Sequence, residues 1–199
     1  GHEEAQKLLD MLAQSQPKLV EEVVPNTISL SVLVKVLQNL LEESVPIRDM
    51  RTIVETLAEH GQKSKEPGQL TQAVREGLAQ MIVQSIVGME REMPVITLEP
   101  QLEQLLLNTI QGSGDGGGFE PGLAERMQQS LSDAVQRQES AGQPAVLLTS
   151  PSLRSWLRRL TRNTAQGLYV LSYNEVPDDR QVRIVATVGQ GQQDSGNQG

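Results

Sequence analysis

The 199-residue sequence contains no cysteine, two histidines and four aromatic residues. The lack of cysteine excludes disulfide scaffolds, Cys-ligated zinc and thiol nucleophiles. His2 follows an N-terminal Gly in a pair typical of a tag-cleavage remnant, so His60 is the one histidine left for chemistry. Such a composition excludes a His-rich metal centre and argues against a Ser-His-Asp triad. Because aromatic residues make up only 2% of the chain, we expect an aliphatic core.

Positive charge and long apolar runs are also scarce. Asp and Glu number 25 against 17 Lys and Arg, which gives a formal net charge of −8. This balance argues against general nucleic-acid binding, and no aromatic platform is available for stacking bases. No run approaches the ~20 apolar residues that a membrane span needs, and no signal peptide is visible. We therefore expect a cytoplasmic segment, which could belong to a larger protein.

Residues 3–88 show the apolar spacing of amphipathic helices joined by short connections. The clearest helix follows a capping residue, Ser29, and ends before Pro46, while Asp49 is placed to cap the next helix. The polar stretch 62–69 is expected to be a loop. The helix that follows Ser29 has its apolar positions at Leu30, Leu33, Val34, Leu37, Leu40 and Leu41. The pattern predicts an all-helical bundle.

The periodicity changes after Gly88, and residues 93–189 predict a compact α/β subdomain of order β-α-α-β-α-β-β. The two final strands flank a Pro177-Asp178-Asp179 turn, and we expect them to pair as antiparallel neighbours. The overall class is α+β, with the helical bundle first. The Gln- and Gly-rich tail, 190–199, is predicted to be disordered.

A Gly-rich loop, Gly112–Gly118, precedes a predicted helix and could in principle hold a phosphate on its backbone amides. The sequence after it lacks the Lys and Ser/Thr of a P-loop, and a dinucleotide loop would follow a strand rather than a helix. Asp115 and Glu120 would also repel an anion. A flexible connector is the favoured interpretation, and a phosphate-binding enzyme or small hydrolase is the alternative.

Catalytic residues are not predicted anywhere in the chain. The paired carboxylates Glu21-Glu22, Glu42-Glu43 and Asp178-Asp179 lie near helix ends or in a turn and fit a solvated surface. His60 lies at the end of its helix, where its charge can interact with the helix dipole. We expect no cofactor and no metal.

Arginines gather on the helix that begins at Pro151. Arg154, Arg158 and Arg162 follow one another at intervals of four residues, and Arg159 lies beside them. Solvation or pairing with local acidic residues is one interpretation, and a docking surface for an acidic partner helix is the other. Trp156 shares the spacing of Leu153, Leu157 and Leu160, which predicts a place in the core.

A second basic segment lies between two helices of the first half. Pro46 ends one helix, Asp49 begins the next, and Arg48 and Arg51 are expected to be exposed. The two arginines are candidates for surface salt bridges or for contact with a neighbouring subunit.

The stretches 35–41 (Lys-Val-Leu-Gln-Asn-Leu-Leu) and 45–59, with Ile47-Arg48-Asp49, resemble the large export-gate family of type III secretion systems, in its flagellar (FlhA) branch. Further matching stretches follow in the family's order: 70–75, 98–103, 119–125, 142–148 and 183–188. The resemblance extends across nearly the whole chain, roughly residues 3–189. The resemblance implies a fragment: the helical third subdomain (3–88) and the α/β fourth subdomain (93–189) of a cytoplasmic domain that follows a membrane domain of a bacterial inner-membrane protein.

The same resemblance implies a role without catalysis. Family members form a nine-subunit ring beneath the export channel and receive chaperone–substrate complexes, the export switch protein and the ATPase stalk protein. No nucleic acid and no membrane contact are implied for this region. We therefore predict a protein-docking, ring-forming module, with Arg154, Arg158, Arg159 and Arg162 as candidate docking residues and Arg48, Asp49 and Arg51 as a subunit contact or structural motif. A self-contained chaperone would need a large exposed apolar groove, which the amphipathic spacing does not predict.

Overall fold

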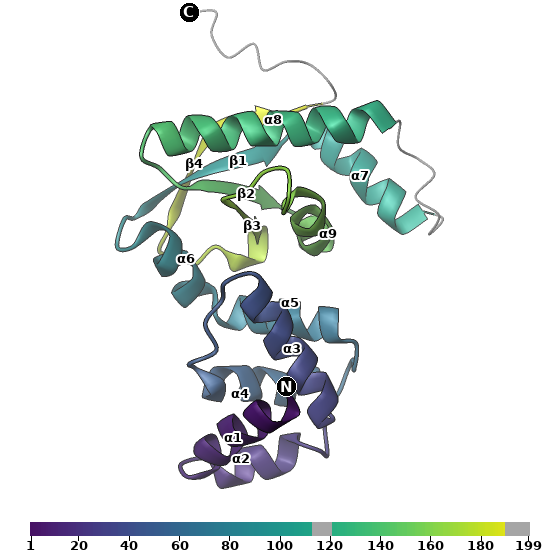
Figure 1. The fold of residues 1–199 in the computed structure, drawn as a ribbon, viewed down its shortest axis with the longest axis vertical. Helices are drawn as coiled ribbons and strands as arrows, with labels where there is room; N and C mark the ends of the chain where they lie inside the picture. Colours follow the sequence, from purple (N-terminus) through teal and green to yellow (C-terminus); the bar gives the residue numbers. More distant parts are fainter. Residues whose placement is uncertain (113–120, 190–199) are drawn as a thin grey trace, which may run out of the picture. The chain divides into compact units, whose positions relative to one another are not determined.

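The computed structural model describes residues 1–112 and 121–189 (Figure 1). The chain forms two compact units, Gly1–Ile82 and a second that begins at Val83. The division falls within helix α6 (Ala79–Val87), a few residues before the 88–93 boundary expected from the change in periodicity. The predicted disordered tail, 190–199, lies outside the described residues.

The first unit is helical, as predicted. Its helices are α1 (His2–Ala13), α2 (Pro17–Val23), α3 (Leu30–Glu42), α4 (Met50–His60) and α5 (Pro67–Gly77), followed by the start of α6. Ser29 caps α3 by accepting a hydrogen bond from the Val32 amide at 3.2 Å. The buried residues of α3 are Leu33, Val34, Val36, Leu37 and Leu40, and α5 packs against both α3 and α4. Leu41, which the spacing placed in the apolar stripe, is 53% exposed because it lies at the edge of the buried sector.

Helix α5 begins earlier than the sequence predicts. The stretch 62–69 is not all loop, because Glu66 accepts hydrogen bonds from the amides of Gly68 and Gln69 and Pro67 takes the first helical position. A carboxylate cap was not recognised in the polar stretch. The apolar spacing from Leu70 to Ile86 predicts one long helix, but the structure divides it at Leu78 into α5 and α6. Gly77 lies so close to α4 that a β-carbon there would come within 2.9 Å of the Thr56 hydroxyl oxygen.

The second unit contains a four-stranded sheet and the helices that cover it. After α6, the elements are β1 (Glu92–Leu98), α7 (Pro100–Gly112), α8 (Pro121–Ser140), β2 (Ala145–Thr149), α9 (Pro151–Thr161), β3 (Leu168–Ser172), a 3₁₀ turn η1 (Tyr173–Glu175) and β4 (Gln181–Val188). The sequence predicts strands at 93–98, 145–149, 168–173 and 182–188, and each observed strand begins and ends within one residue of these bounds.

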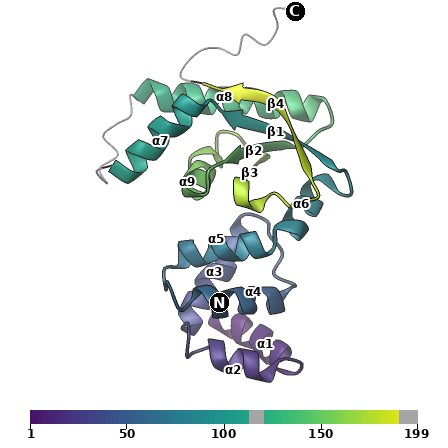
Figure 2. The same ribbon diagram turned by 180° about the vertical axis from the view of Figure 1, so that it is seen from behind.

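The strand order is β3-β2-β1-β4 and every pair is parallel (Figure 2). The expected antiparallel pairing of the two final strands is therefore wrong. After η1 the chain returns to the opposite edge of the sheet, where the Gln181 amide bonds to the Arg91 carbonyl at 2.8 Å. The Arg180 guanidinium donates to the Gly88 carbonyl, also at 2.8 Å. These bonds start β4 beside β1 instead of beside β3.

The pairing register identifies one face of the sheet as the core of this unit. Ile96, Leu147 and Val170 are neighbours across β1, β2 and β3, and all three are buried. Residues of α7, α8 and α9 belong to the same buried cluster, among them Leu102, Leu106, Leu123, Met127, Leu131, Leu153 and Leu157. The three helices therefore cover the same face, and α9 is held against the sheet by its leucines.

Candidate protein-interaction surfaces

Helix α9 is fixed to the sheet by its local sequence. Ser150 takes an extended conformation at the N-cap, and Pro151 at the first position sets the helical φ angle. Leu153 and Leu157 are 0% exposed. Trp156 packs against the same core while remaining partly exposed. The helix is thus a rigid part of the unit.

Arg154 is not part of an exposed stripe. Its exposed fraction is 2%, and its Nη1 donates a hydrogen bond to the Val170 carbonyl oxygen of β3 at 3.1 Å. On a helical wheel Arg154 lies only about 60° from Leu157, within the sector that faces the sheet. The four-residue spacing shows that these arginines share one face of the helix, but it does not show which of them are buried against the sheet.

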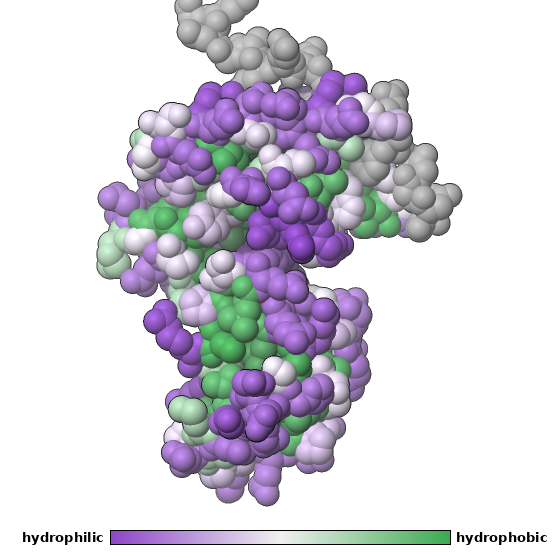
Figure 3. Space-filling model, in the orientation of Figure 1, coloured by the Kyte–Doolittle hydropathy of each residue, from purple (hydrophilic) through white to green (hydrophobic). Residues whose placement is uncertain are grey.

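The other three arginines of α9 differ in their surroundings. Arg158 is partly buried, whereas Arg159 and Arg162 are exposed. Among the described residues, Arg159 and Arg162 make no salt bridge and no side-chain hydrogen bond, while Arg158 does interact with other groups. Figure 3 shows a strongly hydrophilic surface over α9. The exposed basic surface is thus narrower than predicted.

The corner between α3 and α4 carries the second basic segment. Asp49 caps α4: its Oδ1 accepts from the Thr52 amide at 3.0 Å and its Oδ2 from the Thr52 hydroxyl at 2.6 Å. Arg51 is exposed and donates from Nε to Glu55 Oε1 at 2.9 Å. Arg48 is exposed as well. The structure therefore gives Asp49 a structural role and leaves the two arginines at the surface.

A buried ion pair in the helical unit was not recognised in the sequence. Arg75 of α5 is 3% exposed, and its Nη1 lies 3.8 Å from Oε1 of Glu43, which follows α3. Glu43 had been assigned to a solvated carboxylate pair. A positional signal was available, because Arg75 occurs between the buried positions Val74 and Leu78 of the helical pattern.

A polar cluster at the carboxyl edge of the sheet was also missed. Glu103 of α7 accepts hydrogen bonds from the Tyr173 hydroxyl at 2.8 and 3.1 Å and from the Thr149 hydroxyl at 3.3 Å. Desolvation, aided by the hydrogen bond to Glu103 and its negative charge, raises the pKa of Tyr173 to about 12. Carboxyl ends of parallel strands are a common place for ligands. Here the cluster joins η1, α7 and β2 to one another.

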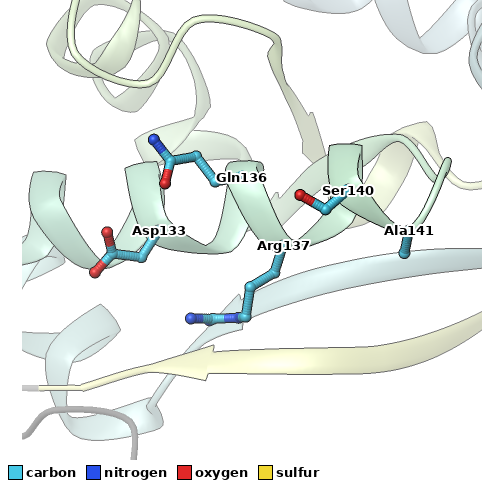
Figure 4. A pocket seen from close by; sticks show the side chains of 5 residues that line it. All are labelled: Asp133, Gln136, Arg137, Ser140 and Ala141. Atoms are coloured by element: carbon cyan, nitrogen blue, oxygen red, sulfur yellow. The ribbon is translucent and has the colours of Figure 1, made fainter.

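Two observations on the described ranges 1–112 and 121–189 concern binding of metals and small ligands. These ranges contain no cluster of three or more His, Asp or Glu side chains arranged to hold a metal. A depression of ≈ 640 Å³ on α8 is lined by Asp133, Gln136, Arg137, Ser140 and Ala141, and Figure 4 shows Asp133 and Arg137 extending on the side of β4. The Gly-rich loop lies outside the described residues from Ser113 onward, so its predicted roles remain predictions.

Comparison with known proteins decides the family. The model of the FHIPEP family matches residues 1–181. The chain belongs to the FHIPEP family. Within the family, it is 49% identical over 189 residues to the flagellar biosynthesis protein FlhA of Escherichia coli K12, covering 95% of this chain and 27% of that protein. This FHIPEP chain thus spans about a quarter of the relative's length.

Solved structures of type III secretion proteins have the same fold. The structure of the Chlamydia pneumoniae CdsV and CdsO complex matches with a TM-score of 0.84 and 27% identity, covering 94% of this chain and 56% of the matched chain. A nonameric SctV-C structure from EPEC matches with a TM-score of 0.81 and 27% identity, covering 94% of this chain and 57% of that one. The predicted family and the mixed helical and sheet fold are confirmed, and the FHIPEP chain is a secretion-related module. In the two described ranges of the FHIPEP chain, every helix is too short or too polar to cross a bilayer.

Proposed function

We propose that this chain is the docking and ring-forming part of a flagellar type III export gate, on the cytoplasmic side of a bacterial inner membrane. The observation that carries the proposal is the 49% identity to E. coli FlhA over 95% of the chain. In this role the chain receives export chaperone–substrate complexes, the switch protein and the ATPase stalk protein. The resolved complex of the similar CdsV with CdsO supports a protein partner for this fold.

The proposed activity is reversible protein binding without catalysis. The contact between Glu103 and Tyr173 supports this view. The two side chains hydrogen-bond to each other and connect separate elements, which is a structural role. Ring assembly would multiply weak contacts at each subunit, so individual sites can be weak and exchange quickly.

Self-association is proposed to use the α3–α4 corner. A closed ring needs two different complementary patches on each subunit. Arg48 and Arg51 are exposed beside the capped start of α4, and Arg51 also pairs with Glu55 of the same helix. The nonameric structure of the similar SctV-C supports ring formation by this fold. An acidic patch on the next subunit is the expected counterpart.

A chimera tests the function directly. The corresponding C-terminal region of E. coli FlhA is replaced by this chain, and swimming is measured in a strain that lacks its own FlhA. Restored swimming is expected, because about half of the residues are identical. A chimera that accumulates in the membrane but supports neither swimming nor filament export would overturn the proposal.

The subunit contact is tested by sedimentation velocity at high protein concentration. The Arg48→Glu/Arg51→Glu variant is expected to lose self-association. Its matched control is Arg159→Glu/Arg162→Glu, which changes the charge equally at the same spacing. Equal association of both variants would refute a role for the corner. If the isolated chain stays monomeric at every concentration, the two variants are introduced into the cytoplasmic region of the chimera. Ring formation by that region is then compared between them.

A further inference from the structure

Helix α9 is an isolated positive element in an acidic chain. Together with its C-cap residue, Arg162, it contains four arginines and no acidic residue. The whole sequence has 25 acidic and 17 basic residues. Because α9 offers no carboxylate of its own, its exposed arginines cannot be neutralised by the usual pairing along one helix.

Two of these arginines are presented for an outside partner. Arg159 and Arg162 are exposed, whereas Arg154 is buried and donates a hydrogen bond to the Val170 carbonyl of the sheet. Their separation of three residues places their β-carbons about 5–6 Å apart on the same side of the helix. Since neither side chain bonds to another residue of the described ranges, both guanidinium groups remain available there.

We infer that Arg159 and Arg162, here called the arginine pair, dock an acidic helix of a partner protein. This inference rests on the proposed function and names the chemistry of one of its partners. Carboxylates three or four residues apart on a facing helix have the spacing of the two guanidinium groups, and each planar guanidinium can hold a carboxylate through two hydrogen bonds. Trp156, three residues before Arg159 on the helix, is partly exposed and offers apolar area to the same partner helix.

The charge of the chain favours a protein over a nucleic acid as the occupant. Nucleic-acid affinity depends on neutralising many phosphates, and two arginines on a surface of net charge −8 neutralise few. An acidic helix needs only a local match and gains from apolar contact. Exposed ion pairs are individually weak, so the contact is fast and reversible.

The binding test uses the full chain and a defined probe. The probe is a synthetic amphipathic helical peptide whose polar face carries only Glu, and its counterpart carries Gln at those positions. Binding is followed by fluorescence anisotropy at low and raised salt. We expect the Glu peptide to bind more weakly as salt rises and the Gln peptide not to bind.

The variants separate a specific contact from general electrostatics. Arg159→Glu/Arg162→Glu is expected to weaken binding of the Glu peptide by about tenfold or more. The control, Arg48→Glu/Arg51→Glu, has the same charge change and spacing and is expected to remain within about twofold of the parent. Arg159→Gln/Arg162→Gln removes the charges without placing carboxylates at the end of α9, and serves if the Glu variant fails to fold.

Two results would overturn the inference. One is that Arg159→Glu/Arg162→Glu and its control, Arg48→Glu/Arg51→Glu, lose binding of the Glu peptide equally, or that neither loses it. The other is a single-stranded RNA that binds more tightly than the Glu peptide and is released by the same arginine-pair substitutions. The chimera distinguishes failure of this inference from failure of the proposed function. If the chimera swims but Arg159→Glu/Arg162→Glu binds the Glu peptide as well as the parent does, only the arginine pair is refuted. If peptide binding depends on the arginine pair but the chimera does not swim, only the export-gate function is refuted.

Discussion

Replacing Leu37 by aspartate is expected to unfold the helical unit. Leu37 lies in α3 and is 5% exposed, within the core that α5 closes. Truncating a buried Leu to Ala costs about 2–5 kcal/mol. Aspartate adds the cost of burying a carboxyl group without a partner, which is several kcal/mol more.

The total is comparable to the whole stability of the unit. At about 0.05–0.15 kcal/mol per residue, the unit Gly1–Ile82 is stabilised by about 4–12 kcal/mol. Leu41→Asp is the matched control, because Leu41 lies on the same helix and is 53% exposed. This control is expected to change the free energy of unfolding by no more than about 0.5 kcal/mol.

The assay is urea denaturation followed by far-UV circular dichroism. Leu37→Asp is expected to lose helical signal in buffer without urea, while Leu41→Asp keeps the parent's midpoint. Trp156 is the only tryptophan and belongs to the second unit, so its fluorescence reports that unit separately. A parent-like midpoint for Leu37→Asp would refute the assignment of the buried face of α3.

Three further predictions concern polar contacts. Asp49→Ala removes both bonds to Thr52 and is expected to cost about 1 kcal/mol in urea denaturation; an unchanged midpoint would show that the cap is dispensable. Glu43→Gln removes the carboxylate charge facing buried Arg75 and is expected to cost about 1–3 kcal/mol, while adding Arg75→Met restores part of that loss; strictly additive effects would contradict the coupling. The pKa of Tyr173 is raised from 10.0 to about 12, so the folded state holds this proton more tightly, and its stabilising effect is complete below pH 10 and lost as pH rises toward about 12. Titration by ultraviolet absorbance is expected to show a lower pKa for Tyr173 in a Glu103→Gln variant, and an unchanged pKa would remove Glu103 as a cause.

The sequence alone located elements whose signals are local. Ser29 and Asp49 were identified as helix caps from their positions before apolar repeats, and both accept the expected hydrogen bonds. The four strands were found because each is a short apolar run bounded by turn residues. The family resemblance was also readable, since its motifs are contiguous stretches in a fixed order.

Tertiary structure decided what depends on partners distant in the chain. The Pro177-Asp178-Asp179 turn fits a hairpin, but bonds from Arg180 and Gln181 to residues 88 and 91 carry β4 to the other edge of the sheet. Helical spacing placed Arg154 with the other arginines of α9, whereas in the folded unit it is buried and donates a hydrogen bond to a carbonyl of β3. Spacing along a chain defines which side chains share a face, whereas burial is set by whichever segment packs against that face, and that segment can lie ninety residues away.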